Sequence, residues 1–168
     1  RDLTLGNRLV VSPMCQYSAP DGVPTDWHLV HLGSRAVGGA GLVVVEATGV
    51  EPEGRITLGC TGLWNQTQAD AFRRIVEFVH QHSRAKIGIQ IGHAGRKASC
   101  ELPWKGGKPL TDARAWPTVG PSALAFDAGQ PVPRELSPAD LERLIERFRA
   151  SARLAVAAGF DLVELHMA

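Results

Sequence analysis

The feature of this sequence that most constrains its fold is a set of short, uninterrupted apolar runs. Residues 42–45 read Leu-Val-Val-Val, and residues 9–11 read Leu-Val-Val before Ser12-Pro13. Strands buried on both faces, as in a parallel sheet, have this pattern, whereas half-exposed strands alternate apolar and polar residues. Two further strands are predicted at 86–92, where three isoleucines alternate with glycine and glutamine, and at 161–166.

Helical patterns separate the predicted strands. The first helix ends at Gly38-Gly39, the second covers residues 66–83 with one apolar stripe, and the third runs from Ser137-Pro138 to Gly159. Ahead of the first strand, Gly6-Asn7 between apolar residues predicts a hairpin turn. Strands and helices thus alternate along the chain, which is typical of a parallel α/β protein.

Such a chain either opens into a doubly wound sheet or closes into a barrel. No Gly-x-Gly-x-x-Gly follows the first strand, and Gly38 to Gly41 follow a helix rather than precede one, so a dinucleotide-binding sheet is disfavoured. Four strands with three intervening helices are half of an eight-stranded (β/α)8 TIM barrel. We therefore expect residues 1–168 to be the N-terminal half of one barrel domain, truncated after its fourth strand.

The even charge balance argues against a nucleic-acid or membrane partner. Lys and Arg total 18 and Asp and Glu total 17, with no long run of one sign. The three cysteines, Cys15, Cys60 and Cys100, lack the spacing of a disulfide framework or a zinc site. Since neither a signal segment nor an apolar run of membrane length is present, we expect a cytoplasmic protein.

In barrels of this kind, the C-terminal ends of the strands carry the chemistry. Here those ends read Ser12 to Cys15, Glu46 to Gly49, Gln90 to His93 and His166 to Ala168. They offer hydroxyl, thiol, amide and imidazole groups but few carboxylates, so neither a metal site nor a paired-carboxylate site is predicted. A flat, polar, aromatic cofactor suits these groups better. The long irregular segment 94–135 is predicted to be functional or an insertion.

Six motifs occur in order along the chain. They are Asn7-Arg8-x-x-x-Ser12-Pro13-Met14-Cys15-x-Tyr17, Val45-Glu46-Ala47, Gly54-Arg55-Ile56, Gln90-x-x-His93-Ala94-Gly95-Arg96-Lys97, Pro121-Ser122-Ala123 and Gly159-Phe160-Asp161-x-Val163-Glu164-x-His166. Together they resemble the Old Yellow Enzyme family, and in particular its bacterial NADPH dehydrogenase and xenobiotic reductase branch. The segment 102–110 is also similar to a loop in the reductase-like domain of bifunctional salicylyl-CoA hydroxylases.

The resemblance implies FMN as cofactor and NADPH, or NADH, as hydride donor. His166 matches the first histidine of a His-x-x-His pair that holds the carbonyl oxygen of the substrate, and Cys15 matches a position where the thiol tunes the flavin. The implied catalytic residues are His166, Tyr17 and Cys15; the implied substrate-binding residues are Tyr17, Lys97 and His166; the implied cofactor-binding residues are Ser12, Pro13, Met14, Cys15, Ala47, Gln90 and His166.

The activity implied by the resemblance is ene reduction, the transfer of hydride to the double bond of an activated alkene such as an α,β-unsaturated carbonyl. Negative charge then builds up on the activating oxygen, where imidazole donors stabilise it, and a phenol or water supplies the proton. Alternatives are a dienoyl-CoA reductase or demethylase of the same family, and a non-catalytic barrel module of a larger protein.

The segment as it stands lacks the second histidine and the later flavin contacts of that family. We therefore expect it to be inactive and to bind FMN weakly on its own, and we expect the full-length protein to form a homo-oligomer.

The same residues also have simpler interpretations. Cys15 alone is compatible with a small buried hydrophobe, Tyr17 with packing, Lys97 with solvation and His166 with a satisfied core histidine. The histidines at 28, 31, 80 and 82 are expected on helices as surface or packing residues, and His93 is expected behind the ligand-contacting residues.

Overall fold

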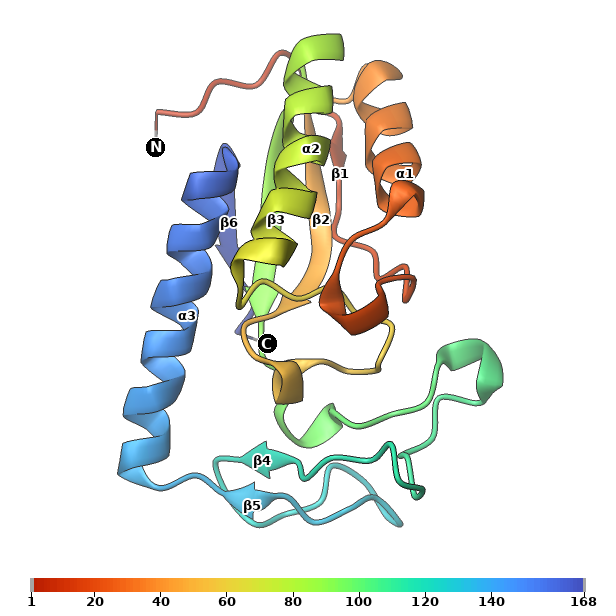
Figure 1. The fold of residues 1–168 in the computed structure, drawn as a ribbon, viewed down its shortest axis with the longest axis vertical. Coiled ribbons are helices and arrows are strands. Elements are labelled where there is room, and N and C mark those ends of the chain that lie inside the picture. Colours follow the sequence, from red (N-terminus) through yellow and green to blue (C-terminus); the bar gives the residue numbers. More distant parts are fainter. Residues whose placement is uncertain (1, 168) are drawn as a thin grey trace.

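The computed structural model describes residues 2–167 and has a four-stranded parallel sheet at its centre (Figure 1). Its strands are β1 (Val10–Val11), β2 (Leu42–Gly49), β3 (Lys86–Gly92) and β6 (Leu162–Leu165), in that order across the sheet. The strands of this sheet therefore lie side by side in the order in which they occur along the chain, and all pairs are parallel. The prediction of buried parallel strands is confirmed.

Three helices connect the strands: α1 (Asp26–Val37), α2 (Gln66–His82) and α3 (Pro138–Ala158). All three cover the same face of the sheet (Figure 1). A doubly wound sheet has helices on both faces, whereas a barrel carries them all on its outer face. The one-sided arrangement and the sequential strand order are therefore those of a (β/α)8 barrel, of which this chain supplies four strands.

The hydrophobic core lies between the sheet and the helices. The three isoleucines of β3 are fully buried there, together with Phe72 of α2 and Ala155 of α3. Burial of each isoleucine contributes about 1.5–3 kcal/mol to folding. Because successive side chains of a strand point to opposite faces, Gln90 lies on the other, inner face of the sheet.

The predicted hairpin at Gly6-Asn7 is wrong, since residues 6–8 form a bend and β1 pairs only in parallel with β2. The Asn7 side chain explains the bend. Its oxygen accepts from the Leu9 N–H at 2.9 Å, and its amide donates to the Gly39 carbonyl at 2.9 Å. Asn7 thus fastens the start of the chain to the turn after α1 instead of reversing the chain.

The segment 94–135 folds beneath the carboxyl ends of the strands (Figure 1). It contains a two-stranded parallel pair that the sequence did not indicate, formed by β4 (Val119–Gly120) and β5 (Arg134–Glu135). Single-turn helices occur within this segment and in other loops, at η1 (Pro20–Gly22), η2 (Pro52–Gly54), η3 (Gly95–Lys97) and η4 (Pro103–Lys105).

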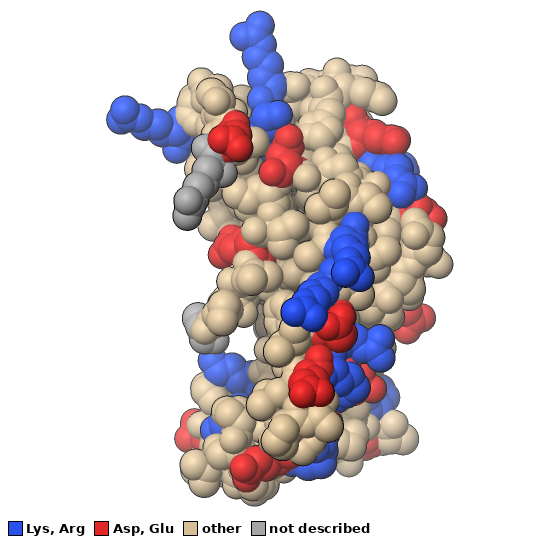
Figure 2. Space-filling view, turned by 90° about the vertical axis from the view of Figure 1, so that its left-hand side faces the viewer, with Lys and Arg blue, Asp and Glu red and all other residues tan. Residues whose placement is uncertain are grey.

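The surface on the side of α3 mixes acidic and basic side chains without a large patch of one sign (Figure 2). This is the pattern of an ordinary solvated helix face rather than of a polyanion-binding surface. Among the helices of residues 2–167, none has the length and apolarity needed to cross a lipid bilayer.

Candidate functional site

A pocket of about 230 Å³ opens at the carboxyl ends of β2, β3 and β6. Three of the predicted site residues line it: Ala47, Lys97 and His166. Two glycines on neighbouring strands, Gly49 and Gly92, pair in register in its wall, and the side chains of Arg55 and His166 pack closely against them. The remaining lining residues are Thr48, Gly54, Arg55, Ile56, His93 and Ala94.

A β-bulge in β2 shapes this wall. The register between β2 and β3 shifts between Val45 and Thr48, so that Glu46 and Ala47 share one position opposite Gln90. Ala47 thereby lines the pocket, whereas Glu46 is 4% exposed and lies among other protein groups.

Glu46 anchors the loop that follows β1. One carboxylate oxygen accepts from the Gln16 N–H at 2.9 Å, and the other lies 3.2 Å from His28 Nε2, though not in line for a hydrogen bond. His28 Nδ1 accepts from the Thr25 N–H at 2.9 Å and so closes the first turn of α1. Sequence reasoning missed this role of Glu46 and His28, for which the only signal was a carboxylate at a strand end.

Gln90 lies on the inner face of β3 and is 8% exposed. Its amide nitrogen donates to Glu164 Oε1 of β6 at 3.0 Å. Among the described residues, no hydrogen bond reaches its amide oxygen, which remains available to a polar ligand edge. This placement agrees with the inward orientation expected from the isoleucine alternation.

The predicted cofactor segment from Ser12 to Cys15 follows β1 at the same edge of the sheet. Ser12 and Met14 are exposed, and Pro13 and Cys15 are half-buried. Burial, and then the negative charge of Glu46, raise the pKa of the Cys15 thiol to about 11, which the Ala47 backbone and the Tyr17 side chain oppose only in part. The thiol is therefore protonated at neutral pH.

Tyr17 does not line the pocket that holds His166. It lines a second cavity of about 240 Å³ together with residues of the segment 100–114, and its ring packs edge-on against Trp104 with centroids 6.0 Å apart. Its backbone has a φ of 51°, a left-handed conformation that is rare for a tyrosine. Burial, and then Cys15, raise the pKa of the Tyr17 phenol to about 12.

Lys97 and His166 both face solvent beside the pocket. The Lys97 ammonium lies 4.5 Å from the centre of the Phe126 ring, a cation–π contact that links it to the segment 94–135. His166 packs against Gly92, where an added Cβ would lie 3.3 Å from the His166 Cβ.

Arg55 is a buried cation in the same wall. Its guanidinium contacts two indole rings, 5.4 Å from the centre of Trp64 and 5.8 Å from that of Trp116. It donates to the carbonyls of Pro52 and Leu58 at 3.0 and 3.5 Å. Burial lowers the pKa of Arg55. The aromatic faces and the carbonyl oxygens, rather than a paired carboxylate, stabilise its positive charge.

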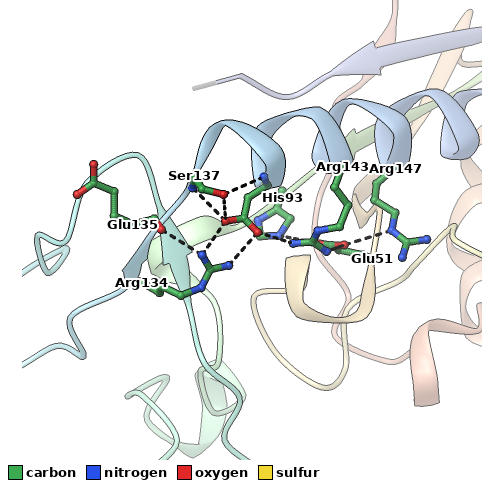
Figure 3. Close-up of polar contacts among 8 residues, drawn as sticks. Glu51, His93, Arg134, Glu135, Ser137, Arg143 and Arg147 are labelled. Atoms are coloured by element: carbon green, nitrogen blue, oxygen red, sulfur yellow. Dashed lines mark hydrogen bonds and ion pairs between the residues drawn. The ribbon is translucent and has the colours of Figure 1, made fainter.

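His93, which the sequence placed behind the ligand-contacting residues, lines the pocket and is tied to a buried carboxylate. Its Nε2 lies 3.2 Å from Glu51 Oε1, and the other oxygen of Glu51 accepts from Arg143 of α3 at 3.0 Å (Figure 3). The spacing of Arg143 and Arg147 along one helix face was the available signal, but their partner lies 92 residues from Arg143 in sequence.

The donor set fits a flavin better than it fits a metal. The inner amide of Gln90 and the glycine-lined wall suit a flat ring with a polar edge. Within residues 2–167, no three His, Cys, Asp or Glu side chains are grouped to hold a metal ion.

The model of one protein family, described as the NADH:flavin oxidoreductase / NADH oxidase family, matches residues 1–168. An NADH:flavin oxidoreductase of Gibberella zeae is 48% identical over 173 residues, covering 100% of this chain and 42% of that protein. An NADPH dehydrogenase of Geobacillus thermodenitrificans is 42% identical over 170 residues, covering 100% and 46%.

Solved structures give the same result. Morphinone reductase superposes with a TM-score of 0.81 at 31% identity, covering 98% of this chain and 45% of that one. Old Yellow Enzyme from a Pichia species gives 0.81 at 29% identity, covering 96% and 42%. The chain thus spans a little under half the length of these relatives. Taken with the one-sided (β/α) sheet and the glycine-walled pocket, the match of the family model along all 168 residues shows that the chain belongs to the NADH:flavin oxidoreductase / NADH oxidase family.

Proposed function

We propose that this chain forms part of the FMN site of an oxidoreductase that reduces activated carbon–carbon double bonds with NADPH or NADH, and that residues 1–168 are part of one barrel domain. The observation that carries the proposal is the convergence of Ala47, Lys97 and His166 on one pocket, with Gln90 on the inner face of the same sheet. FMN, when bound, would accept hydride from the nicotinamide and pass it to the substrate.

Gln90 and the Ala47 backbone would hold the polar edge of the flavin. The amide oxygen of Gln90 is an acceptor without a protein partner among the described residues, and the bulge brings Ala47 to the same wall. The loop from Ser12 to Cys15 would lie along the ring, fixed in place through the hydrogen bond from Gln16 to Glu46.

His166 would donate a hydrogen bond to the activating oxygen of the substrate, where negative charge develops. Its exposed ring at the end of β6 makes it accessible to a ligand in the pocket. Tyr17, with a phenol that stays protonated at neutral pH, would supply the proton, and Lys97 would contact the substrate at the rim. Because Tyr17 lines the second cavity, the substrate would have to extend between the two pockets.

The test is an anaerobic titration of the FMN-loaded full-length protein, first with NADPH and then with cyclohexenone. We expect the flavin absorbance to bleach with NADPH and to recover with the enone. His166→Ala should slow the recovery about 100-fold, the usual cost of losing one oxyanion donor. His82→Ala, which removes an exposed histidine of α2, is the matched control and should have no effect.

Other outcomes would point elsewhere. Bleaching without recovery by any activated alkene would contradict ene reduction and favour a dienoyl-CoA reductase or demethylase. A full-length protein that takes up no flavin at all would favour a non-catalytic module.

A further inference from the structure

His93 lines the pocket, yet neither nitrogen of its ring is free for a ligand. Nδ1 accepts from the Gly95 N–H at 2.9 Å, and Nε2 faces Glu51 Oε1 at 3.2 Å. The imidazole side chain is 7% exposed, and its Cδ2 would lie 2.9 Å from a Cβ added at Gly54, so its edge is packed against that backbone. An Nδ1 that accepts a hydrogen bond carries no proton, so the ring is the neutral, Nε2-protonated tautomer.

Glu51 interacts with two arginines as well as with His93. Its side chain is 5% exposed and pairs with Arg143 Nη1 at 3.0 Å and Arg147 Nε at 3.4 Å, both from α3 (Figure 3). Arg143 also lies 3.7 Å from Asp140, which in turn binds Arg134 of β5 at 2.7 Å. A buried carboxylate held in this way is strongly oriented. The network therefore fixes the ring of His93 from α3 and β5.

Through the hydrogen bond from the Gly95 N–H, the oriented His93 ring holds the turn that follows it. Gly95 begins η3, the turn that ends at Lys97, and its φ of 58° is one that glycine adopts without strain. The Lys97 N–H bonds to the Ala94 carbonyl at 3.0 Å, and the Ala94 N–H bonds to the Gly54 carbonyl at 2.8 Å. His93 is thus the side-chain contact that ties this turn to the Glu51 network.

We propose that the Glu51–His93 pair positions the turn from Ala94 to Lys97 at the pocket wall, and that it does so only while His93 is neutral. Protonation would place a second N–H on Nδ1, opposite the N–H of Gly95, and the two donors would repel. His93 is accordingly a positioning residue, whereas His166, which is open to ligands, is the donor of the proposed reaction. The functional part of this inference rests on the proposed flavin site.

The charges around His93 make its protonation adjustable. Burial lowers its pKa, the carboxylates of Glu51 and then Glu53 raise it, and Arg143 lowers it. Arg147 acts through Glu51, and the remaining charged or titratable groups of the same pocket are Arg55, Lys97 and His166. The net shift is downward, so His93 stays neutral at pH 7 and becomes protonated only below the ordinary histidine range.

The test uses two variants that act on His93 in opposite directions. Glu51→Gln removes the negative charge and should lower the titration midpoint of His93, while Arg143→Met removes a positive charge and should raise it, each by about one pH unit. Arg149→Met is the matched control, because Arg149 lies on the same helix with the same charge but pairs with Glu146. The readouts are the NMR titration of the His93 ring, the exchange rate of the Gly95 amide and the pH dependence of the FMN dissociation constant.

We expect all three readouts to share one midpoint, which moves down in Glu51→Gln, up in Arg143→Met and not at all in Arg149→Met. His93→Asn, whose side-chain oxygen can accept from Gly95 but cannot be protonated, should abolish the acid limb while retaining affinity at neutral pH. Shifts of both variants in the same direction, an Nδ1-protonated tautomer, or an acid limb that survives in His93→Asn would overturn the proposal. The ring titration and amide exchange need no flavin, so a failure of the proposed function would leave them as a separate test.

Discussion

Burial sets the protonation states of single residues at the carboxyl edge of the sheet. Cys15 and Tyr17 lie two residues apart in a loop, yet both keep their protons well beyond neutral pH because the charged form of each would be poorly solvated beside Glu46. Cys15 is thus a neutral thiol rather than a reactive thiolate, and Tyr17 is a hydrogen-bond donor at physiological pH.

The thiol of Cys15 should consequently resist alkylation. A pKa raised from 9.0 to about 11 leaves about 100-fold less thiolate at neutral pH. We expect the iodoacetamide reaction at this residue, followed by peptide mass spectrometry, to be about 100-fold slower than that of N-acetylcysteine at pH 7.5 and to accelerate up to about pH 11. Complete modification at pH 7.5 at the rate of the free thiol would contradict the assignment.

The positions of some of these residues could be predicted from sequence patterns, whereas the contacts of others could not, for a physical reason. Gln90 could be placed on the inner face because strand alternation is local, and the structure puts it there. Glu51 could not be linked to His93, because their pairing depends on how the loop after β2 meets α3. The separation of Tyr17 from His166 likewise depends on how the segment 100–114 folds over Tyr17.

Among the elements, α3 begins as its sequence indicated and contributes more than a core face. Ser137 Oγ accepts from the Asp140 N–H at 3.2 Å, and the Asp140 carboxylate accepts from the Ser137 N–H at 3.0 Å, which completes a capping box. Asp140 also binds Arg134, so the first turn of α3 is joined to β5. A local motif thereby fixes a non-local contact.

Removal of this cap should destabilise the protein measurably. Ser137→Ala loses the acceptor for the Asp140 N–H and is expected to lower the free energy of unfolding by about 1 kcal/mol, measured by urea denaturation. Ser34→Ala, at an exposed position within α1, is the control and should stay within about 0.5 kcal/mol of the original protein. An equal effect of the two substitutions would mean that the cap contributes nothing.

The bounds of β3, α2 and α3 follow closely from local patterns, since caps and hydrophobic periodicity are encoded within each segment. The bulge at Glu46–Ala47 does not, because its register is set by pairing with β3. The β4–β5 pair was missed because strands of two residues carry no periodic signal in the sequence.

At the scale of the whole molecule, the helices of the described residues cover only one face of the sheet (Figure 1). Val10 of β1 is 51% exposed and Leu165 of β6 is 54% exposed, and both strands are edges of the sheet. Curated relatives of this chain are about twice its length. The proposed flavin site is therefore built here from four adjacent strands, without the remaining part of a closed barrel.

The 168-residue chain on its own should accordingly bind FMN weakly, if at all. We expect the purified chain to carry no flavin absorbance and to show a dissociation constant at least about 100-fold weaker than that of a closed barrel of the family, since each lost charge-assisted contact costs about 1.5–3 kcal/mol. Fluorescence titration with FMN measures this directly. Stoichiometric FMN that survives purification of the chain would refute it.

The bulge in β2 has a consequence for how mutations along this strand are read. The side chains of Val43 and Val45 face the helices, and strict alternation would make Ala47 and Gly49 face them too. The extra residue of the bulge shifts the alternation, so that Thr48, which pairs with Ile91, faces the helices instead. Deletion of one residue at 46–47 would restore the simple count, because the residue that remains would stand alone opposite Gln90 while Thr48 stays opposite Ile91 and Gly49 stays opposite Gly92. A single residue would then have to replace both Glu46, which anchors the loop after β1, and Ala47, which lines the pocket, so the deletion would cost one of these two roles while leaving the rest of the strand in register.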